Sequence, residues 1–151
     1  MDNIHRTRAM FNDMLNLPRG KYVPVGVAAG GSISFARGAF AVSYDRDLLP
    51  IPGCGVYDGL PDMDLILDAE RRKGWQAGTE IALGDLYLKD TPFGLCPRGI
   101  LKTAIKNWVD MGYNPMIGIE TEAYVFQRDE DGVWRPYDTP GAFVYGTGPE
   151  N

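Results

Sequence analysis

The stretch GYNPMIGIETEAYVF, residues 112–126, constrains the fold and the function more than any other part of the sequence. Residues 116–126 follow Asn114-Pro115, are mostly apolar and predict a β-strand. Because side chains alternate between the two faces of a strand, we expect Glu120, Glu122 and Tyr124 to share one face. Two carboxylates would then point the same way from a single strand.

The spacing of Glu120 and Glu122 is compatible with metal binding. Residues two apart on a strand are separated by about 7 Å, which is too far to share one proton but suits two neighbouring cations. The chain has one histidine, His5, so the expected ligands are oxygen atoms, which suit Mg²⁺ or Mn²⁺. Solvent-facing glutamates of an amphipathic strand are the alternative, and spacing alone leaves both interpretations open.

A helix and a hairpin are predicted on either side of this strand. Residues 96–99, Cys-Pro-Arg-Gly, place a proline at the first helical position. Apolar residues then recur at helical spacing as far as Met111, and Gly112 ends the helix. After the strand, residues 128–132 predict a turn and residues 133–134 predict an antiparallel return.

The first 90 residues predict a small domain made mainly of strands. Its start allows two interpretations: an amphipathic helix over residues 4–15, or a strand over residues 7–13 that turns into a second strand over residues 21–28. Residues 26–59 are rich in Gly and Pro and predict a long irregular segment. Further strands are predicted over residues 65–67 and 81–88. A change in composition near residues 90–96 separates these strands from the predicted helix. The predicted fold class is therefore α+β.

Composition excludes several classes of function. The formal charge of −5 and the sequence pI near 4.8 leave no surplus of basic residues for nucleic acid or for an anionic membrane. The sequence has neither an apolar run long enough to span a bilayer nor a signal peptide, which predicts a cytoplasmic protein. Cys54 and Cys96 do not form a CxxC pair and are expected to be reduced, packed thiols.

Other charged residues have plainer interpretations. Arg19, Lys21 and Arg98 lie near predicted turns, where solvated surface charge is the simplest explanation. Three aspartates alternate along the approach to one predicted strand and are expected to protect a sheet edge; they are Asp62, Asp64 and Asp68. The glycine-rich stretches match neither a Walker loop nor a G-x-G-x-x-G motif, so they predict no nucleotide site.

Four motifs in order carry a resemblance that covers almost the whole chain. They are RGKYVP (residues 19–24), PDMDLILD (61–68), CPRGIL (96–101) and GYNPMIGIETEAYVF (112–126). Together they resemble the glutamine synthetase superfamily. The resemblance implies a small N-terminal β-grasp domain over residues 1–92, followed over residues 93–151 by the first helix and strands of the catalytic domain. It also favours the hairpin over the helix at the start of the chain.

The resemblance also implies a reaction and a set of ligands. The two glutamates of the family motif, Glu120 and Glu122 here, would bind separate Mg²⁺ or Mn²⁺ ions beside the γ-phosphate of ATP. The γ-carboxylate of glutamate would be activated as a γ-glutamyl phosphate, and an amine or ammonia would attack it, as in other ligases of nitrogen metabolism. Tyr145 matches an aromatic residue near the amine site. The complete enzyme would be a ring-shaped homo-oligomer with sites between subunits.

Two departures from the family pattern affect these expectations. Ammonia-using members carry an aspartate where this sequence has Ala41, so the chain resembles the branch that couples glutamate to polyamines or other amines, unless Asp45 or Asp47 substitutes. The sequence also ends before the other site residues of the family, so we expect this chain alone to be an inactive fragment. Alternatives are a non-catalytic assembly or regulatory module, and a general acidic α+β binding domain.

Overall fold

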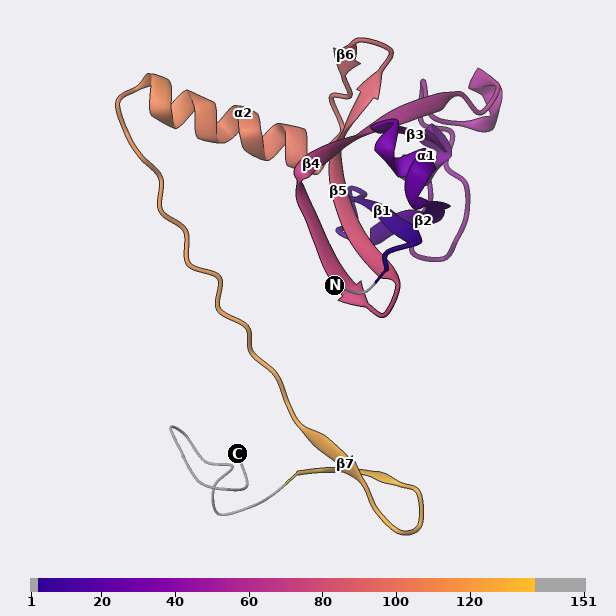
Figure 1. Ribbon diagram of the computed structural model, residues 1–151, viewed down its shortest axis with the longest axis vertical. Coiled ribbons are helices and arrows are strands. Elements are labelled where there is room, and N and C mark those ends of the chain that lie inside the picture. The colour runs from indigo at the N-terminus through magenta and orange to yellow at the C-terminus, as the bar shows by residue number, and fades with distance from the viewer. Residues whose placement is uncertain (1–2, 138–151) are drawn as a thin grey trace. The chain divides into compact units, whose positions relative to one another are not determined.

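The computed structural model describes residues 3–137 and shows a mixed α+β fold, as predicted. The chain divides into two compact units, Met1–Pro115 and Met116–Asn151. The first unit contains a curled sheet with the strand order β2-β1-β5-β4-β3, with β6 beside β5 (Figure 1). Its strands are β1 (Arg6–Asn12), β2 (Pro18–Pro24), β3 (Ser32–Ala36), β4 (Asp62–Gln76), β5 (Thr79–Leu88) and β6 (Thr91–Pro92). Its helices are α1 (Val25–Ala29) and α2 (Pro97–Asp110), with 3₁₀ turns at Arg37–Phe40 and Val56–Asp58.

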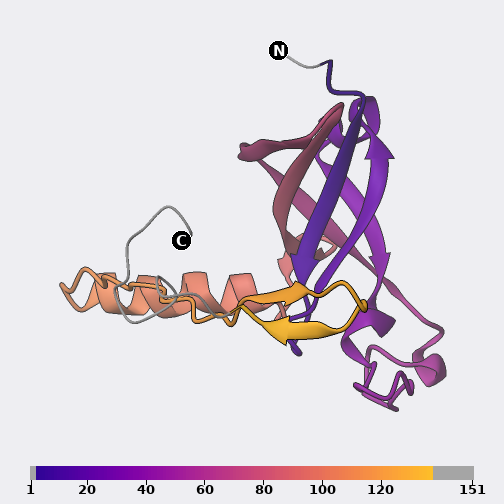
Figure 2. The ribbon, with the colours of Figure 1, turned by 90° about the horizontal axis from the view of Figure 1, so that it is seen from below.

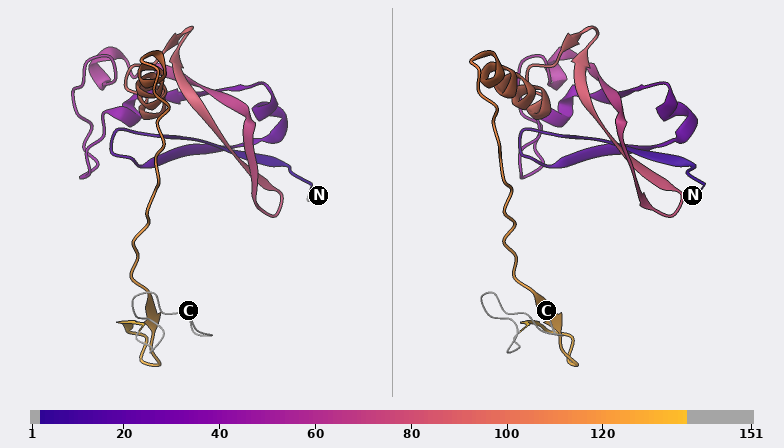
Figure 3. Two further views of the ribbon diagram at one scale, coloured as in Figure 1. Left: turned by 90° about the vertical axis from the view of Figure 1, so that its left-hand side faces the viewer. Right: turned by 60° about the vertical axis from the view of Figure 1, so that its left-hand side comes forward.

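The start of the chain forms the predicted hairpin and not the alternative helix. β1 pairs with β2 antiparallel and with β5 parallel. Thr7, Ala9 and Phe11 of β1 are buried, while the residues between them lie on the opposite face, which is the alternation expected of a strand with one covered side. Figure 3 shows the curl of this sheet from two further sides.

The second strand is shorter than predicted. The prediction of a strand over residues 21–28 is right as far as Pro24 and wrong beyond it, because Val25–Ala29 forms the short helix α1. Pro24 pairs with Arg6, the first residue of β1, so residues after Pro24 have no further strand to pair with. The alternating valines of this segment do not prolong the strand, because no neighbouring strand satisfies the backbone N–H and C=O groups after Pro24.

Strands β3 and β4 also differ from the sequence prediction. The irregular segment predicted over residues 26–59 contains a strand, β3, which buries Ile33 and Phe35 against β4. β4 runs well beyond the predicted residues 65–67, through a register shift between Leu67 and Arg72. Because β3 pairs with residues 62–66 of β4, the edge-protecting role predicted for Asp62 and Asp64 is wrong, whereas Asp68 lies beyond the residues that pair with β3.

Four phenylalanine rings form the centre of the core. Phe11 packs edge-on against Phe35 at a centroid distance of 5.0 Å and stacks on Phe40 at 5.9 Å. Phe40 in turn contacts Phe93 edge-on at 5.0 Å. The rings join β1, β3, the 3₁₀ turn and the segment before α2, so burial of these four side chains holds distant parts of the chain together. Two free cysteines are buried at the same core, as predicted: Cys54 and Cys96.

Helix α2 begins and ends as predicted. Pro97 occupies its first turn, and Gly112 follows the last turn with φ of 85°, a conformation that glycine adopts without strain. Only the start of α2 lies against the sheet, and the rest runs away from it (Figure 2). Every residue of α2 from Ile100 onward is exposed, including the apolar ones.

The second unit contains an antiparallel hairpin of β7 (Phe126–Arg128) and β8 (Trp134–Pro136), joined by the predicted turn. Asp129 closes this turn by accepting hydrogen bonds from the backbone N–H of Val133 and the guanidinium of Arg135. The longer strand predicted over residues 116–126 is wrong except for its last residue. In the described part of the chain, no helix has both the length and the apolar character needed to cross a membrane.

Candidate functional site

Glu120 and Glu122 lie in the segment that leads to β7, where the described chain forms neither helix nor strand (Figure 1). Both side chains are exposed, and neither takes part in a hydrogen bond or ion pair with another described residue. The apolar side chains around them are equally open, with Met116, Ile119 and Tyr124 each more than nine-tenths exposed. Large apolar side chains gathered at such exposure indicate a surface that another segment normally covers.

The donor atoms of this segment suit a divalent cation, but they are few. Carboxylate oxygen is the ligand that Mg²⁺ and Mn²⁺ prefer, and Glu120 and Glu122 supply it without competing partners among residues 3–137. Within those residues, no group of three or more His, Cys, Asp or Glu side chains is placed to hold a metal ion. Among residues 3–137, the two glutamates therefore offer carboxylate ligands but do not make a complete metal site by themselves.

Two other predicted site positions have different outcomes. Tyr145, assigned by resemblance to the amine site, lies outside the described residues. Ala41 is completely buried at the end of the first 3₁₀ turn, and its carbonyl accepts a hydrogen bond from the backbone N–H of Leu49. Asp45 and Asp47, the residues considered as substitutes, are exposed in the loop that follows.

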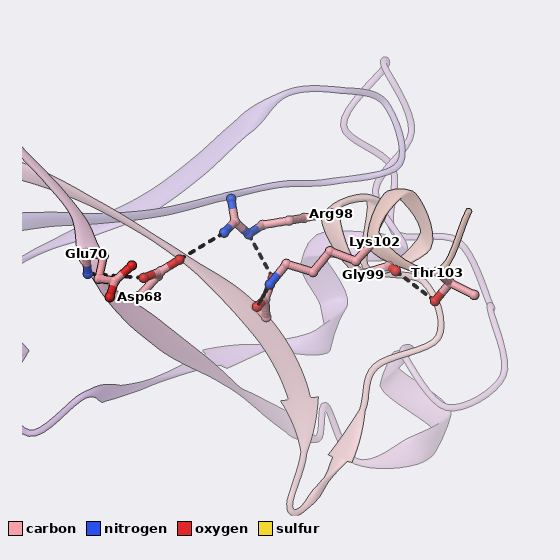
Figure 4. A network of polar contacts seen from close by, with 7 residues as sticks. Asp68, Glu70, Arg98, Gly99, Lys102 and Thr103 are labelled. Atoms are coloured by element: carbon pink, nitrogen blue, oxygen red, sulfur yellow. Dashed lines mark hydrogen bonds and ion pairs between the residues drawn. The ribbon is translucent and has the colours of Figure 1, made fainter. Parts of the chain in front are cut away.

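The structure also reveals a charged network that sequence reasoning missed (Figure 4). Arg98, in the first turn of α2, donates a hydrogen bond of 2.8 Å to Asp85 on β5 and lies 3.3 Å from Asp68 on β4. Lys102, one helical turn later, also pairs with Asp85. The i, i+4 spacing of Arg98 and Lys102 was visible in the sequence, but their acceptors lie 13 to 30 residues away and only the sheet brings them close.

The network changes the ionisation of Asp85. Partial burial by itself would raise the pKa of Asp85. Hydrogen bonds from Lys102 and Arg98, together with the positive charges of these two residues, outweigh burial and hold the pKa of Asp85 below its usual value. The carboxylate is therefore charged throughout the neutral range. Its role is to attach the start of α2 to the sheet.

The basic residues predicted to be solvated surface charges are not free in the structure. Arg19 forms an ion pair of 2.6 Å with Asp13, whose side chain is almost wholly buried. Lys21 donates a hydrogen bond to the backbone carbonyl of Ser34. With the ion pairs of Arg98, the prediction of solvated charge is wrong for Arg19 and Arg98, which are partly buried and paired with carboxylates. Lys21 is exposed, as predicted, although its ammonium group is hydrogen-bonded.

Comparison with known proteins relates the chain to one group of enzymes. It is 30% identical over 132 residues to the glutamine synthetase of Pyrococcus furiosus, an alignment that covers 83% of this chain and 26% of the relative. It is 31% identical over 134 residues to the gamma-glutamylanilide synthase of an Acinetobacter species, over 78% of this chain and 27% of that protein. No family model matches the chain.

The fold has matches among solved structures as well. The protein GmaS in its ADP complex superimposes with a TM-score of 0.55 at 22% sequence identity, over 73% of this chain and 24% of GmaS. A crystal structure of a novel glutamine synthase homologue gives a TM-score of 0.57 at 17% identity. The chain spans about a quarter of the length of the curated relatives that it matches.

Proposed function

The chain is a homologue of part of the glutamine synthetase superfamily, and we propose that it supplies the N-terminal part of an ATP-dependent ligase that joins glutamate to an amine through γ-glutamyl phosphate. The observation that carries this proposal is the identity of about 30% to two kinds of γ-glutamyl ligase over roughly four-fifths of the chain. In this proposal residues 1–92 form the β-grasp domain, and the catalytic domain begins near residue 93, just before α2, so that the first unit contains the β-grasp domain together with the first helix of the catalytic domain.

Glu120 and Glu122 are the residues of the described chain that would hold the divalent cations. The alignment to the Pyrococcus enzyme covers 83% of the chain, and any continuous stretch of that length contains both glutamates. Both carboxylates are exposed and have no hydrogen-bond or ion-pair partner among residues 3–137, which supports this role. When bound, the cations would neutralise charge on the transferring phosphoryl group of ATP.

The proposed second substrate is an amine larger than ammonia. Ala41 has no ionisable group with which to bind or deprotonate ammonium. One of the curated relatives is named for a γ-glutamyl product of aniline, an aromatic amine. Polyamines and aryl amines are therefore the substrate classes to test first, with Tyr145 as the proposed aromatic residue of the amine site.

We also propose, from the homology alone, a cytoplasmic homo-oligomer with sites between subunits. Among residues 3–137, the two glutamates by themselves make an incomplete metal site. Completion of the site by other segments, from the same subunit or a neighbour, would also cover the exposed apolar side chains around Glu120. Sedimentation of the natural protein that contains this sequence tests this point, and a monomer that turns over substrate at full rate would contradict it.

Titration with Mn²⁺ tests the metal assignment. In the natural protein that contains this sequence, Glu120→Ala and Glu122→Ala are each expected to weaken Mn²⁺ binding by roughly tenfold or more, because each removes a direct ligand. Glu130→Ala, which changes an exposed glutamate on the β7–β8 turn, is the matched control and should leave the affinity unchanged. Unchanged Mn²⁺ binding in both glutamate variants would reject the assignment.

The substrate proposal is tested separately by ATP turnover with glutamate and a panel containing ammonia, aliphatic polyamines and aryl amines. The expected result is fastest turnover with an organic amine. Ammonia as the best substrate would overturn the argument from Ala41, while leaving the metal assignment intact. No turnover with any amine, in a protein that folds and binds Mn²⁺, would favour a non-catalytic module.

A further inference from the structure

A cluster of cations and aromatic rings lies on the sheet face opposite the phenylalanine core. Paired positions place Lys73 of β4, Ile81 of β5, Arg8 of β1 and Tyr22 of β2 in one row across the sheet. Because paired residues point to the same side of a sheet, this row shares the face that lies away from buried Ala9 and Phe11. The row and its neighbours are called the Arg8 face: Arg6, Arg8, Tyr22, Lys73, Trp75 and Ile81.

Aromatic rings hold the guanidinium of Arg8 in place. Its Cζ atom lies 4.7 Å from the centre of the Trp75 ring and 5.8 Å from the centre of the Tyr22 ring. Arg6 covers the same tyrosine at 4.9 Å and donates a hydrogen bond to Thr79. A guanidinium packed against aromatic rings keeps the N–H groups on its edge available, and a planar fork of donors matches the geometry of a carboxylate.

Arg8 differs from the other well-packed arginines of the first unit. Arg19, Arg72 and Arg98 each form an ion pair with a carboxylate of the same unit. Arg8, in contrast, forms no ion pair or side-chain hydrogen bond with any residue between 3 and 137, although its position is fixed by two strands and two rings. Within the described residues, the N–H donors of Arg8 therefore have a fixed position and no acceptor.

The charge of this face is opposite to the charge of the chain. The sequence carries a formal charge of −5, but the six residues of the Arg8 face include three cations and no acidic residue. Two aspartates farther along the same side of the sheet, Asp68 and Asp85, are paired with Arg98. The exposed rings of Tyr22 and Trp75, each about half exposed, add apolar surface directly beside these cations. A complementary ligand therefore carries carboxylates next to apolar or aromatic groups.

We propose that the Arg8 face binds an acidic peptide segment of a partner protein, with a carboxylate on the guanidinium of Arg8 and an apolar side chain against Trp75 or Tyr22. The sparse charge of an acidic peptide suits a face with three cations. A nucleic acid has a denser charge, which the net negative charge of the chain would repel. This inference is independent of the metal site and of the ligase reaction.

Binding of a synthetic copolymer tests the inference. Fluorescein-labelled random poly(Glu,Tyr), which presents carboxylates and aromatic rings, is titrated with the full chain and followed by anisotropy. Arg8→Glu is expected to weaken binding by at least tenfold. Arg8→Lys, which keeps the charge but loses the planar fork, should lie between Arg8→Glu and the unmodified chain. Arg46→Glu, the same charge change in an exposed loop outside this face, is the matched control and should bind as the unmodified chain does.

Two further measurements make the outcome decisive. Circular dichroism confirms that each variant is folded, and Trp75→Leu removes one ring without changing charge and should weaken binding several-fold. Equal binding by Arg8→Glu and the unmodified chain overturns the proposal, as does equal loss of binding in Arg46→Glu. Absence of binding would mean that the cluster only stabilises the sheet, which rejects the proposal too. Tighter binding of labelled oligo(dT) than of the copolymer would make the partner a nucleic acid and would likewise reject it.

Discussion

The Nε atom of Arg98 lies 2.8 Å from the Oδ1 atom of Asp85, and this contact is the centre of the attachment between helix α2 and the sheet. The same guanidinium reaches Asp68 on the neighbouring strand, so one side chain joins α2 to both β4 and β5. Beyond its first turn α2 has no buried residue. The attachment of α2 to the sheet therefore depends on a few ion pairs and on the packing of the segment around Cys96.

Removal of Arg98 should loosen this attachment. Arg98→Gln keeps much of the side-chain volume but loses the charge that two carboxylates share, and we expect it to lower the free energy of unfolding by about 1 kcal/mol. Lys106→Gln breaks an exposed pair within α2 and is the control, with an expected effect of a few tenths of a kcal/mol. Urea unfolding measures both, and an equal effect of the two substitutions would contradict the assigned role.

The lowered pKa of Asp85 predicts a dependence of stability on pH. A carboxyl group whose pKa is lower in the folded state stabilises the fold above its unfolded value of about 4, and this contribution is lost as the pH falls through the folded value. The difference in unfolding free energy between the unmodified chain and Asp85→Asn should therefore be larger at pH 7 than at pH 3. Asp90→Asn, on the exposed β5–β6 turn, is the control. An Asp85→Asn difference that is the same at both pH values would refute the prediction.

Gly84 should tolerate no side chain. A Cβ atom added there would lie 2.2 Å from the backbone oxygen of Ile66 on β4, so Gly84→Ala is expected to cost about 1–3 kcal/mol through strain in the sheet. Gly74→Ala is a matched control on β4, because nothing lies within 4 Å of a Cβ atom at that position. Thermal denaturation compares the two, and similar melting temperatures would show that the sheet relaxes around the added methyl group at no cost.

Asp13 should be the most sensitive charged residue of the first unit. Its buried carboxylate accepts hydrogen bonds from the backbone N–H groups of Leu15 and Leu17 and from Arg19, which closes the β1–β2 turn. Asp13→Ala is expected to lower the free energy of unfolding by about 2–4 kcal/mol, because it leaves these donors without their acceptor. Asn12→Ala removes only an exposed contact with Asn16 and should cost much less. Comparable losses in a denaturant titration would contradict this ranking.

The sequence by itself determined the features that depend on neighbouring residues. The start of α2 at Pro97 and its end before Gly112 follow from local backbone chemistry. The residue pattern left a helix and a hairpin open at the start of the chain, and the family resemblance favoured the hairpin that the structure contains. The family motif around Glu120 and Glu122 identified the superfamily, although the strand expected there is present only at Phe126. Their metal role stays a prediction, as does the domain boundary near residue 92.

Only the tertiary structure decided which strands continue and which charges meet. β2 stops at Pro24 and β4 extends to Gln76 because a strand lasts only as long as a partner satisfies its backbone groups, and the partners lie far away in sequence. The pairing of Arg98 with Asp85, and the packing of Arg8 between Trp75 and Tyr22, likewise need the sheet to bring separate segments together. Local residue patterns contain no information on such long-range contacts, so the ion-pair network and the Arg8 face were not visible from the sequence.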